Sequence, residues 1–150
     1  MIDIFQNNPI VSVGLCVTLF GCLAFHRLAL YRQKLSERVQ ASEKFVSSVT
    51  SVLSEIYPVS SSWPENIDAY LRNKFPLLQS AVEAFKPYAC DKKGFERAWK
   101  LYRLGDTGRN IDKQLYHQYM GFQTNDEPRI IPEQRMQENI GRLLSHAKNI

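Results

Sequence analysis

The feature of this sequence that most limits its fold is a run of uncharged residues close to the N-terminus. The run PIVSVGLCVTLFGCLAF extends from Pro9 to Phe25, and apolar residues continue past Arg27 to Leu30. An α-helix rises about 1.5 Å per residue, so about 20 apolar residues cross the hydrocarbon core of a bilayer. Residues 10–30 reach this length if the Arg27 side chain extends to the headgroups, so the sequence predicts a transmembrane helix.

Charged residues around this run predict its orientation. Residues 1–9 contain a single charged side chain, that of Asp3, whereas basic residues are frequent after the run. These are Arg27, Arg32, Lys34 and Arg38. Cytoplasmic flanks are rich in Arg and Lys, and a cleaved secretory signal would carry its basic residues before the apolar core. We therefore expect a single-pass anchor in a plasma membrane, the inner membrane of a bacterium, with residues 1–9 outside and the C-terminal domain cytoplasmic.

One alternative is that the run forms a buried helix of a soluble protein. Such a helix is usually shorter, and it carries polar residues at helical spacing on at least one side. Within the run, small side chains share a narrow strip: Gly14, Thr18, Gly21 and Cys22. Small residues let transmembrane helices approach closely, so this strip is a candidate pairing face, with plain solvation by lipid as the alternative we favour.

The cysteines give no sign of a disulfide framework. Cys16 and Cys22 lie inside the predicted span, where they behave as small apolar residues, and Cys90 is the third. This pattern fits a reducing compartment and agrees with a cytoplasmic domain.

Residues 31–57 are predicted to continue the helix as a juxtamembrane stalk, because no turn residue interrupts the chain before Pro58. Its apolar residues have heptad-like spacing: Leu28, Leu35, Val39, Val46, Val49, Leu53 and Ile56. Such a stripe indicates either pairing with a second stalk or packing against the chain's own domain. We favour packing within the chain.

Residues 64–150 are predicted to form a small cytoplasmic bundle of about four helices, so the fold class is all-α. Pro64 is expected to open a helix that kinks or restarts at Pro76, Asp91 to cap the next, and Pro132 to open the last. The predicted buried faces are Ile67, Tyr70, Leu71, Phe75, Leu77, Leu78, Ala81, Val82 and Phe85, then Phe95, Ala98, Trp99 and Tyr102, then Met136, Ile140, Leu143, Leu144 and Ala147. No segment alternates with a period of two for long enough to predict a strand.

The helix expected after Asp91 is basic on the side opposite its aromatic residues. Its basic residues are Lys92, Lys93, Arg97, Lys100 and Arg103, and Glu96 is its only acidic residue. A solvated outer face is the interpretation we favour. A contact with anionic headgroups is the second, because the anchor holds the domain near the cytoplasmic leaflet. A nucleic-acid contact is disfavoured, because it would need exposed aromatic residues for stacking.

The centre of the chain is rich in aromatic residues: Trp99, Tyr102, Tyr116, Tyr119 and Phe122. Core packing is the interpretation we favour for them, and a hot spot for a protein partner is the alternative.

No catalytic, cofactor or metal site is predicted. Asp106-Thr107-Gly108 matches the aspartic-protease tripeptide, but it follows a predicted helix instead of an apolar strand and is ordinary turn chemistry. Cys90 could act as a nucleophile with His117 or His146 as its base only in a fold that brings them together, and no motif around these residues favours this. Metal-ligand spacings and phosphate-binding loops are missing from the sequence.

These observations predict a membrane-tethered helical module that acts through a protein partner or self-association, as a scaffold, an accessory subunit or a regulator. The alternatives are an enzyme acting on membrane-proximal substrates, and anionic-lipid or nucleic-acid binding by residues 92–103. No motif set is specific enough to name a functional family.

Overall fold

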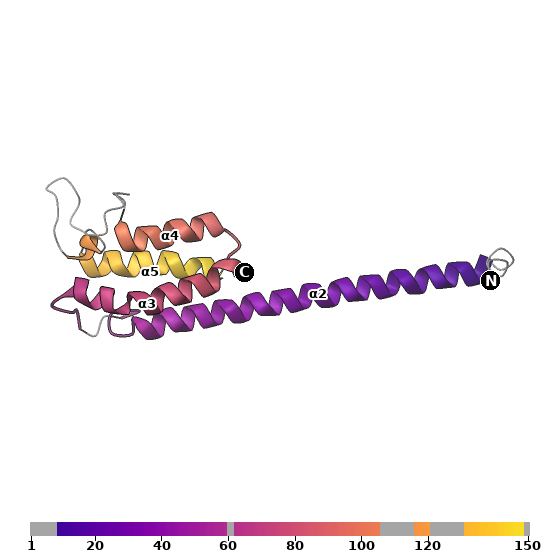
Figure 1. Cartoon of the computed structure of the whole chain (residues 1–150), viewed down its shortest axis with the longest axis horizontal. Helices are drawn as coiled ribbons and strands as arrows, with labels where there is room; N and C mark the ends of the chain where they lie inside the picture. Colours follow the sequence, from indigo (N-terminus) through magenta and orange to yellow (C-terminus); the bar gives the residue numbers. More distant parts are fainter. Residues whose placement is uncertain (1–8, 60–61, 106–115, 121–130, 149–150) are drawn as a thin grey trace. The chain divides into compact units, whose positions relative to one another are not determined.

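The computed structural model describes residues 9–59, 62–105, 116–120 and 131–148, with side chains from residue 14 onward except that of Cys16. All regular secondary structure within these residues is helical (Figure 1), which confirms the all-α prediction. The elements are α2 (Pro9–Val52), α3 (Ile67–Phe85), η1 (Lys86–Tyr88), α4 (Lys92–Leu104), η3 (His117–Tyr119) and α5 (Pro132–Lys148). The chain divides into an N-terminal unit, Met1–Arg38, and a C-terminal unit, Val39–Ile150.

The described residues of the N-terminal unit form one continuous stretch of α2. Large apolar side chains are exposed along it: Leu15, Val17, Leu19, Phe20, Leu23, Phe25, Leu28, Leu30 and Leu35. Among the residues that the structure describes, no helix is long and apolar enough to cross a membrane. The side chains of residues 10–13 and of Cys16, which belong to the predicted span, are not described.

The part of α2 in the C-terminal unit contributes to a hydrophobic core. Phe45 and Val49 are buried there, together with Leu53 and Ile56 of the following turn. This confirms packing within the chain for the second half of the heptad-like stripe. The helix ends at Val52, short of the predicted end of the stalk at residue 57. It ends early because the backbone N–H groups of residues 56 and 57 both donate to the Leu53 carbonyl, forming a turn that buries Ile56.

The first residues of α3 correct one prediction. The helix does not open at Pro64 but at Ile67, because the Asn66 side chain accepts a hydrogen bond of 2.9 Å from the Ala69 backbone N–H. Asn is among the strongest N-cap residues, since it satisfies a donor that has no partner in the first turn. Pro76 lies inside the helix and does not restart it.

The buried face of α3 also differs at one position from the predicted stripe. Leu71, Leu78, Val82 and Phe85 are buried as expected, but Leu77 is 58% exposed. Leu71, Leu78, Val82 and Phe85 lie on one face of the helix, and Leu77 projects about 100° away from Leu78 toward solvent. The sequence prediction placed both leucines on the buried face because they are adjacent apolar residues.

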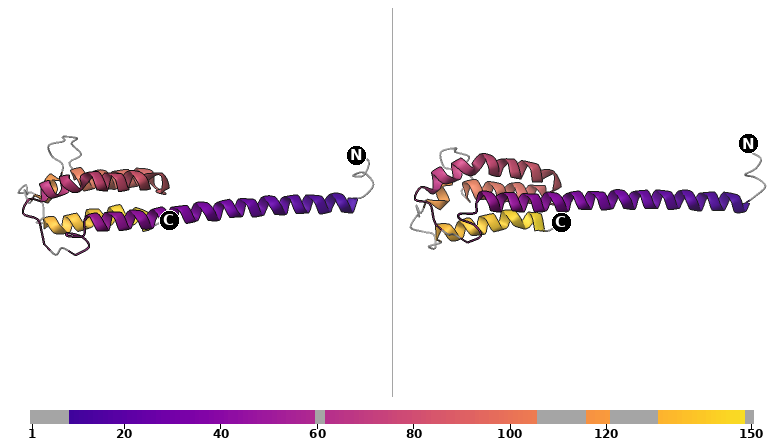
Figure 2. Two further views of the ribbon diagram at one scale, coloured as in Figure 1. Left: turned by 60° about the horizontal axis from the view of Figure 1, so that its bottom comes forward. Right: turned by 90° about the horizontal axis from the view of Figure 1, so that it is seen from below.

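Helices α4 and α5 pack against each other, and their buried faces agree with the prediction. Asp91 caps α4 as expected, accepting from the Gly94 backbone N–H at 2.9 Å. A Cβ atom at Gly94 would come within 2.9 Å of the His146 ring, so glycine permits the close approach of α5 to this cap. Figure 2 shows the helices of the C-terminal unit lying lengthwise beside one another as a bundle.

Three phenylalanines join the helices of this unit at its core. Phe45 stacks on Phe85 with ring centroids 4.7 Å apart. The Phe95 ring meets both edge-on, at 5.6 Å from Phe45 and 5.3 Å from Phe85. Aromatic pairs with these geometries add about 0.5–1.5 kcal/mol beyond the area that they bury. The cluster therefore ties α2, α3 and α4 together.

Candidate functional site

The basic side chains of α4 lie mainly on the surface of the C-terminal unit. Lys92, Lys93, Arg97 and Lys100 are exposed. Glu96, the acidic residue among them, pairs with Lys86 at 2.7 Å, which raises the pKa of the lysine through this hydrogen bond. The charge of Glu96 is thus balanced from outside α4, and the four exposed cations give this face a net positive charge.

Arg103, the fifth residue of the predicted basic set, has a different environment. Its guanidinium carbon lies 5.1 Å from the centre of the Trp99 ring, a cation–π arrangement. Its Nε atom is buried, with no hydrogen-bond partner among the described residues. Arg103 is therefore partly a packing residue, and the exposed basic face consists of the other four.

The aromatic cluster is part of the core. Trp99, Tyr102, Tyr116 and Tyr119 are all buried, which confirms core packing for these four, while Phe122 lies outside the described residues. Trp99 and Tyr102 stack with ring centroids 5.5 Å apart, and Tyr102 meets Tyr116 edge-on at 5.9 Å.

A buried hydrogen-bond network that the sequence did not reveal crosses this cluster. The Tyr119 hydroxyl donates to the Tyr102 backbone carbonyl at 2.8 Å and accepts from the Asn139 amide at 3.0 Å. Asn139 is the one buried polar residue of the described core, and it lies between Met136 and Ile140 on the inner face of α5. A polar residue inside an apolar stripe was the only signal in the sequence.

Three other tyrosine hydroxyls of the C-terminal unit differ from that of Tyr119. Within the described residues, the Tyr70, Tyr102 and Tyr116 hydroxyl oxygens are buried without a hydrogen bond. Burial raises the pKa of Tyr102 and of Tyr116, because the phenolate form loses its hydration. It also raises the pKa of Tyr119, against an opposing effect of the hydrogen bond from Asn139.

Two equally buried tyrosines allow a matched test of this difference. Tyr119→Phe should lower the free energy of unfolding by about 1–2 kcal/mol, because the Asn139 amide and the Tyr102 carbonyl both lose a partner. Tyr102→Phe should be neutral or stabilising by up to about 1 kcal/mol, because it removes a hydroxyl without a partner. Urea denaturation of both variants measures the two effects. Equal losses of unfolding free energy in the two variants would contradict the hydrogen bonds assigned to the Tyr119 hydroxyl.

The buried tyrosines also predict a dependence of stability on alkaline pH. In the unfolded chain Tyr102, Tyr116 and Tyr119 would ionise near pH 10, whereas in the folded chain their raised pKa values keep them neutral. Stability should thus be complete below about pH 10 and fall above it, by about 1.4 kcal/mol per pH unit for each tyrosine. Phenolate absorbance of these residues should rise together with loss of helical circular dichroism. Ionisation of all three in a chain that stays helical would contradict this.

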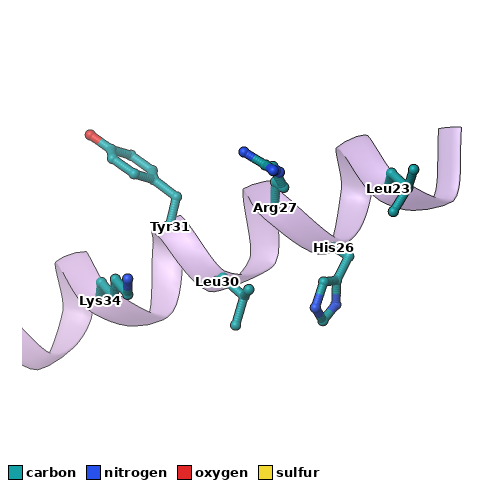
Figure 3. A pocket seen from close by; sticks show the side chains of 6 residues that line it. All are labelled: Leu23, His26, Arg27, Leu30, Tyr31 and Lys34. Carbon is teal, nitrogen blue, oxygen red and sulfur yellow. The ribbon is translucent and has the colours of Figure 1, made fainter. Parts of the chain in front are cut away.

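A second cluster of cationic and aromatic side chains lies on α2 in the N-terminal unit. An open groove of about 510 Å³ is lined by Leu23, His26, Arg27, Leu30, Tyr31 and Lys34. Figure 3 shows Arg27 and Tyr31 on one side of the helix and His26 and Leu30 on the other. The sequence predicted that Arg27 would reach the headgroups, but not that these six side chains would line one groove.

The predicted pairing face of small residues is open. A Cβ atom built at Gly14 or Gly21 would meet no described atom within 4 Å. The Thr18 hydroxyl donates to the Gly14 and Leu15 carbonyls of its own helix, at 3.2 and 2.9 Å. The strip therefore exposes backbone and small side chains without an unsatisfied hydroxyl.

The residues considered for catalysis have different surroundings in the described part of the chain. The thiols of Cys22 and Cys90 are free and exposed. His146 packs edge-on against the Phe95 ring, with centroids 6.0 Å apart. The tripeptide at 106–108 lies outside the described residues. Within the residues that were described, no group of three His, Cys, Asp or Glu side chains is arranged to hold a metal ion.

Comparisons with protein-family models, with curated proteins and with solved structures found no match to this chain.

Proposed function

We propose that this chain is a single-pass membrane protein whose helical C-terminal unit acts through protein contacts, as a scaffold, an accessory subunit or a regulator. The anchor is the segment from Ile10 to Leu30, with the N-terminus outside and the C-terminal unit in the cytoplasm of a cell bounded by that membrane.

The observation that carries the proposal is the exposure of large apolar side chains on the N-terminal part of α2. Phe20 is 73% exposed and Phe25 76% exposed, and the segment PIVSVGLCVTLFGCLAF contains no charged residue. Soluble proteins rarely expose a continuous apolar surface of this kind, since its contact with water is costly. A bilayer would remove these side chains from water, and the helix satisfies its own backbone hydrogen bonds there.

One experiment tests separately whether the chain is retained in the membrane and on which side its C-terminus lies. Membranes containing the full chain with a C-terminal tag are washed at alkaline pH and high salt, and intact cells are treated with a protease. We expect the chain to stay in the membrane fraction and the tag to resist the protease until the membrane is opened. Recovery in the soluble fraction without detergent would refute the anchor, and cleavage of the tag in intact cells would refute the orientation.

Support for protein contacts comes from two exposed features of α2. Gly14 and Gly21 leave room for a second helix, and Leu28, Leu35 and Val39, which belong to the heptad-like stripe of the sequence, are exposed. Small residues and apolar stripes are the usual contacts between helices. Purification in a mild detergent after chemical cross-linking should therefore yield a partner protein or a second copy. A wild-type chain that elutes alone and uncross-linked would contradict the proposal.

The exposed cations of α4 favour a second candidate, contact with anionic headgroups. Lys92, Lys93, Arg97 and Lys100 carry positive charge at the surface, and Glu96 is already paired with Lys86. Each basic residue near an anionic leaflet contributes about 1 kcal/mol, and salt screens this attraction. Protection of α4 by anionic vesicles that disappears at high salt would support this contact, and protection unaffected by salt would oppose it.

A further inference from the structure

The groove on α2 combines apolar and cationic side chains along one strip of the helix. Leu23, Arg27, Leu30 and Lys34 follow one another at intervals of four, three and four residues, which places them in one broad strip, with Arg27 toward the side of Tyr31 and Leu30 toward the side of His26. Figure 3 shows Tyr31 on one flank of this strip and His26 on the other. The groove is therefore lined by two leucines, two cations and two polar rings.

The order of these side chains along the helix matters. Leu23 belongs to the uncharged run, and Lys34 is farthest from it. Side chains on a helix lean toward its N-terminus, so the Lys34 ammonium leans back toward Leu30 and Arg27. Arg27 has a long side chain whose guanidinium can extend the other way, as snorkelling residues do. The two residues are seven positions apart, about 10 Å along the helix axis, so both long side chains must lean toward each other to reach one phosphate.

We propose that this groove binds one anionic phospholipid of the cytoplasmic leaflet. Its phosphate oxygens accept hydrogen bonds from the Arg27 guanidinium, the Lys34 ammonium and the Tyr31 hydroxyl, and an acyl chain packs on Leu23 and Leu30. The planar fork of Arg matches two oxygens of a phosphate, which Lys alone would not do. The inference rests on the proposed membrane anchor, because only an inserted helix brings the groove to the headgroups.

The test uses the full chain and a matched pair of double variants. Arg27→Gln with Lys34→Gln removes two charges from the groove. Arg32→Gln with Arg38→Gln removes two charges from the same helix at residues that do not line it. Each chain is reconstituted in vesicles of phosphatidylcholine with phosphatidylglycerol and extracted in mild detergent. Native mass spectrometry then measures the phospholipid that stays bound.

We expect the wild-type chain and the control variant to retain phosphatidylglycerol in preference to phosphatidylcholine. The groove variant should bind it roughly 30-fold more weakly, since each cation near a phosphate contributes about fivefold. Inorganic phosphate, added as a competitor, should not displace the lipid, because it makes no contact with Leu23 or Leu30.

Three results would overturn the site. Equal retention by the two double variants would mean that only the total charge of α2 matters. Equal retention of the two lipids by the wild-type chain would mean that the phosphate contacts confer no selectivity. Displacement by inorganic phosphate would mean that the acyl chain is not bound. Insertion is measured separately by flotation in vesicles of phosphatidylcholine alone, and failure there would refute the anchor instead of the site.

Discussion

Replacing Phe95 with alanine should lower the free energy of unfolding of the C-terminal unit by about 3–5 kcal/mol. The Phe95 side chain is 0% exposed and lies edge-on to Phe45 and Phe85, so its removal leaves a cavity among three helices. The loss combines the transfer energy of the ring with the contacts that its neighbours cannot remake. Small domains are stable by only about 5–15 kcal/mol, so much of this unit's stability should disappear.

The measurement is denaturant unfolding of the full chain, followed by helical circular dichroism, with Leu77→Ala as the control. Leu77 is also an apolar residue of the bundle, but its side chain is 58% exposed. Its truncation should change the free energy of unfolding by no more than about 0.5 kcal/mol. Similar losses for the two variants would mean that Phe95 is not at the centre of the core.

Most of the helical architecture of the C-terminal unit was predictable from the spacing of apolar residues. In α4 the intervals between Phe95, Ala98, Trp99 and Tyr102 define a single face, and these are the residues that the structure buries. The apolar residues predicted for the face of α5 are also buried, and Asn139 is the one addition. Amphipathic periodicity works here because each helix has one side on the core and one in water.

Where the prediction was wrong or incomplete, the cause was local chemistry that periodicity does not measure. Asn66 fixes the start of α3 by accepting a hydrogen bond, although Pro64 offered a start signal two residues earlier. The run of two leucines at 77 and 78 gave no indication of which one faces the core. Asn139 is buried because it donates to the Tyr119 hydroxyl, a partner some 20 residues away in the chain.

The candidate sites were predictable to different degrees. The cations of α4 were identified from their positions opposite the aromatic residues of the predicted helix, but the stacking of Arg103 on Trp99 depends on the rotamers of both residues. The groove on α2 was missed because its residues had been assigned to two segments, with Leu23 in the span and Lys34 in the stalk. The continuous helix was predicted, and its spacing of four, three and four residues places these side chains on one strip.

An arginine placed at the centre of the proposed anchor should have the largest effect on membrane association. Leu19 lies close to the midpoint between Ile10 and Leu30, and its side chain is exposed. Arg at the centre of a transmembrane helix costs about 2.5–3.5 kcal/mol in insertion experiments, and the leucine that it replaces was favourable. Leu19→Arg should therefore lower the inserted fraction, relative to the uninserted one, by about 100-fold or more.

Leu28→Arg is the matched control, because it makes the same substitution on the same helix beside Arg27. The cost of an arginine falls toward the headgroups, where its side chain can reach water, so this variant should insert almost as well as the wild-type chain. Flotation with vesicles after an alkaline wash measures both. The helical signal and urea midpoint of the C-terminal unit should be unchanged in each variant, because residues 19 and 28 contribute nothing to its core. If the two arginines reduced flotation equally, depth in a bilayer would not be the variable, and α2 would be binding vesicles by its surface instead of crossing them.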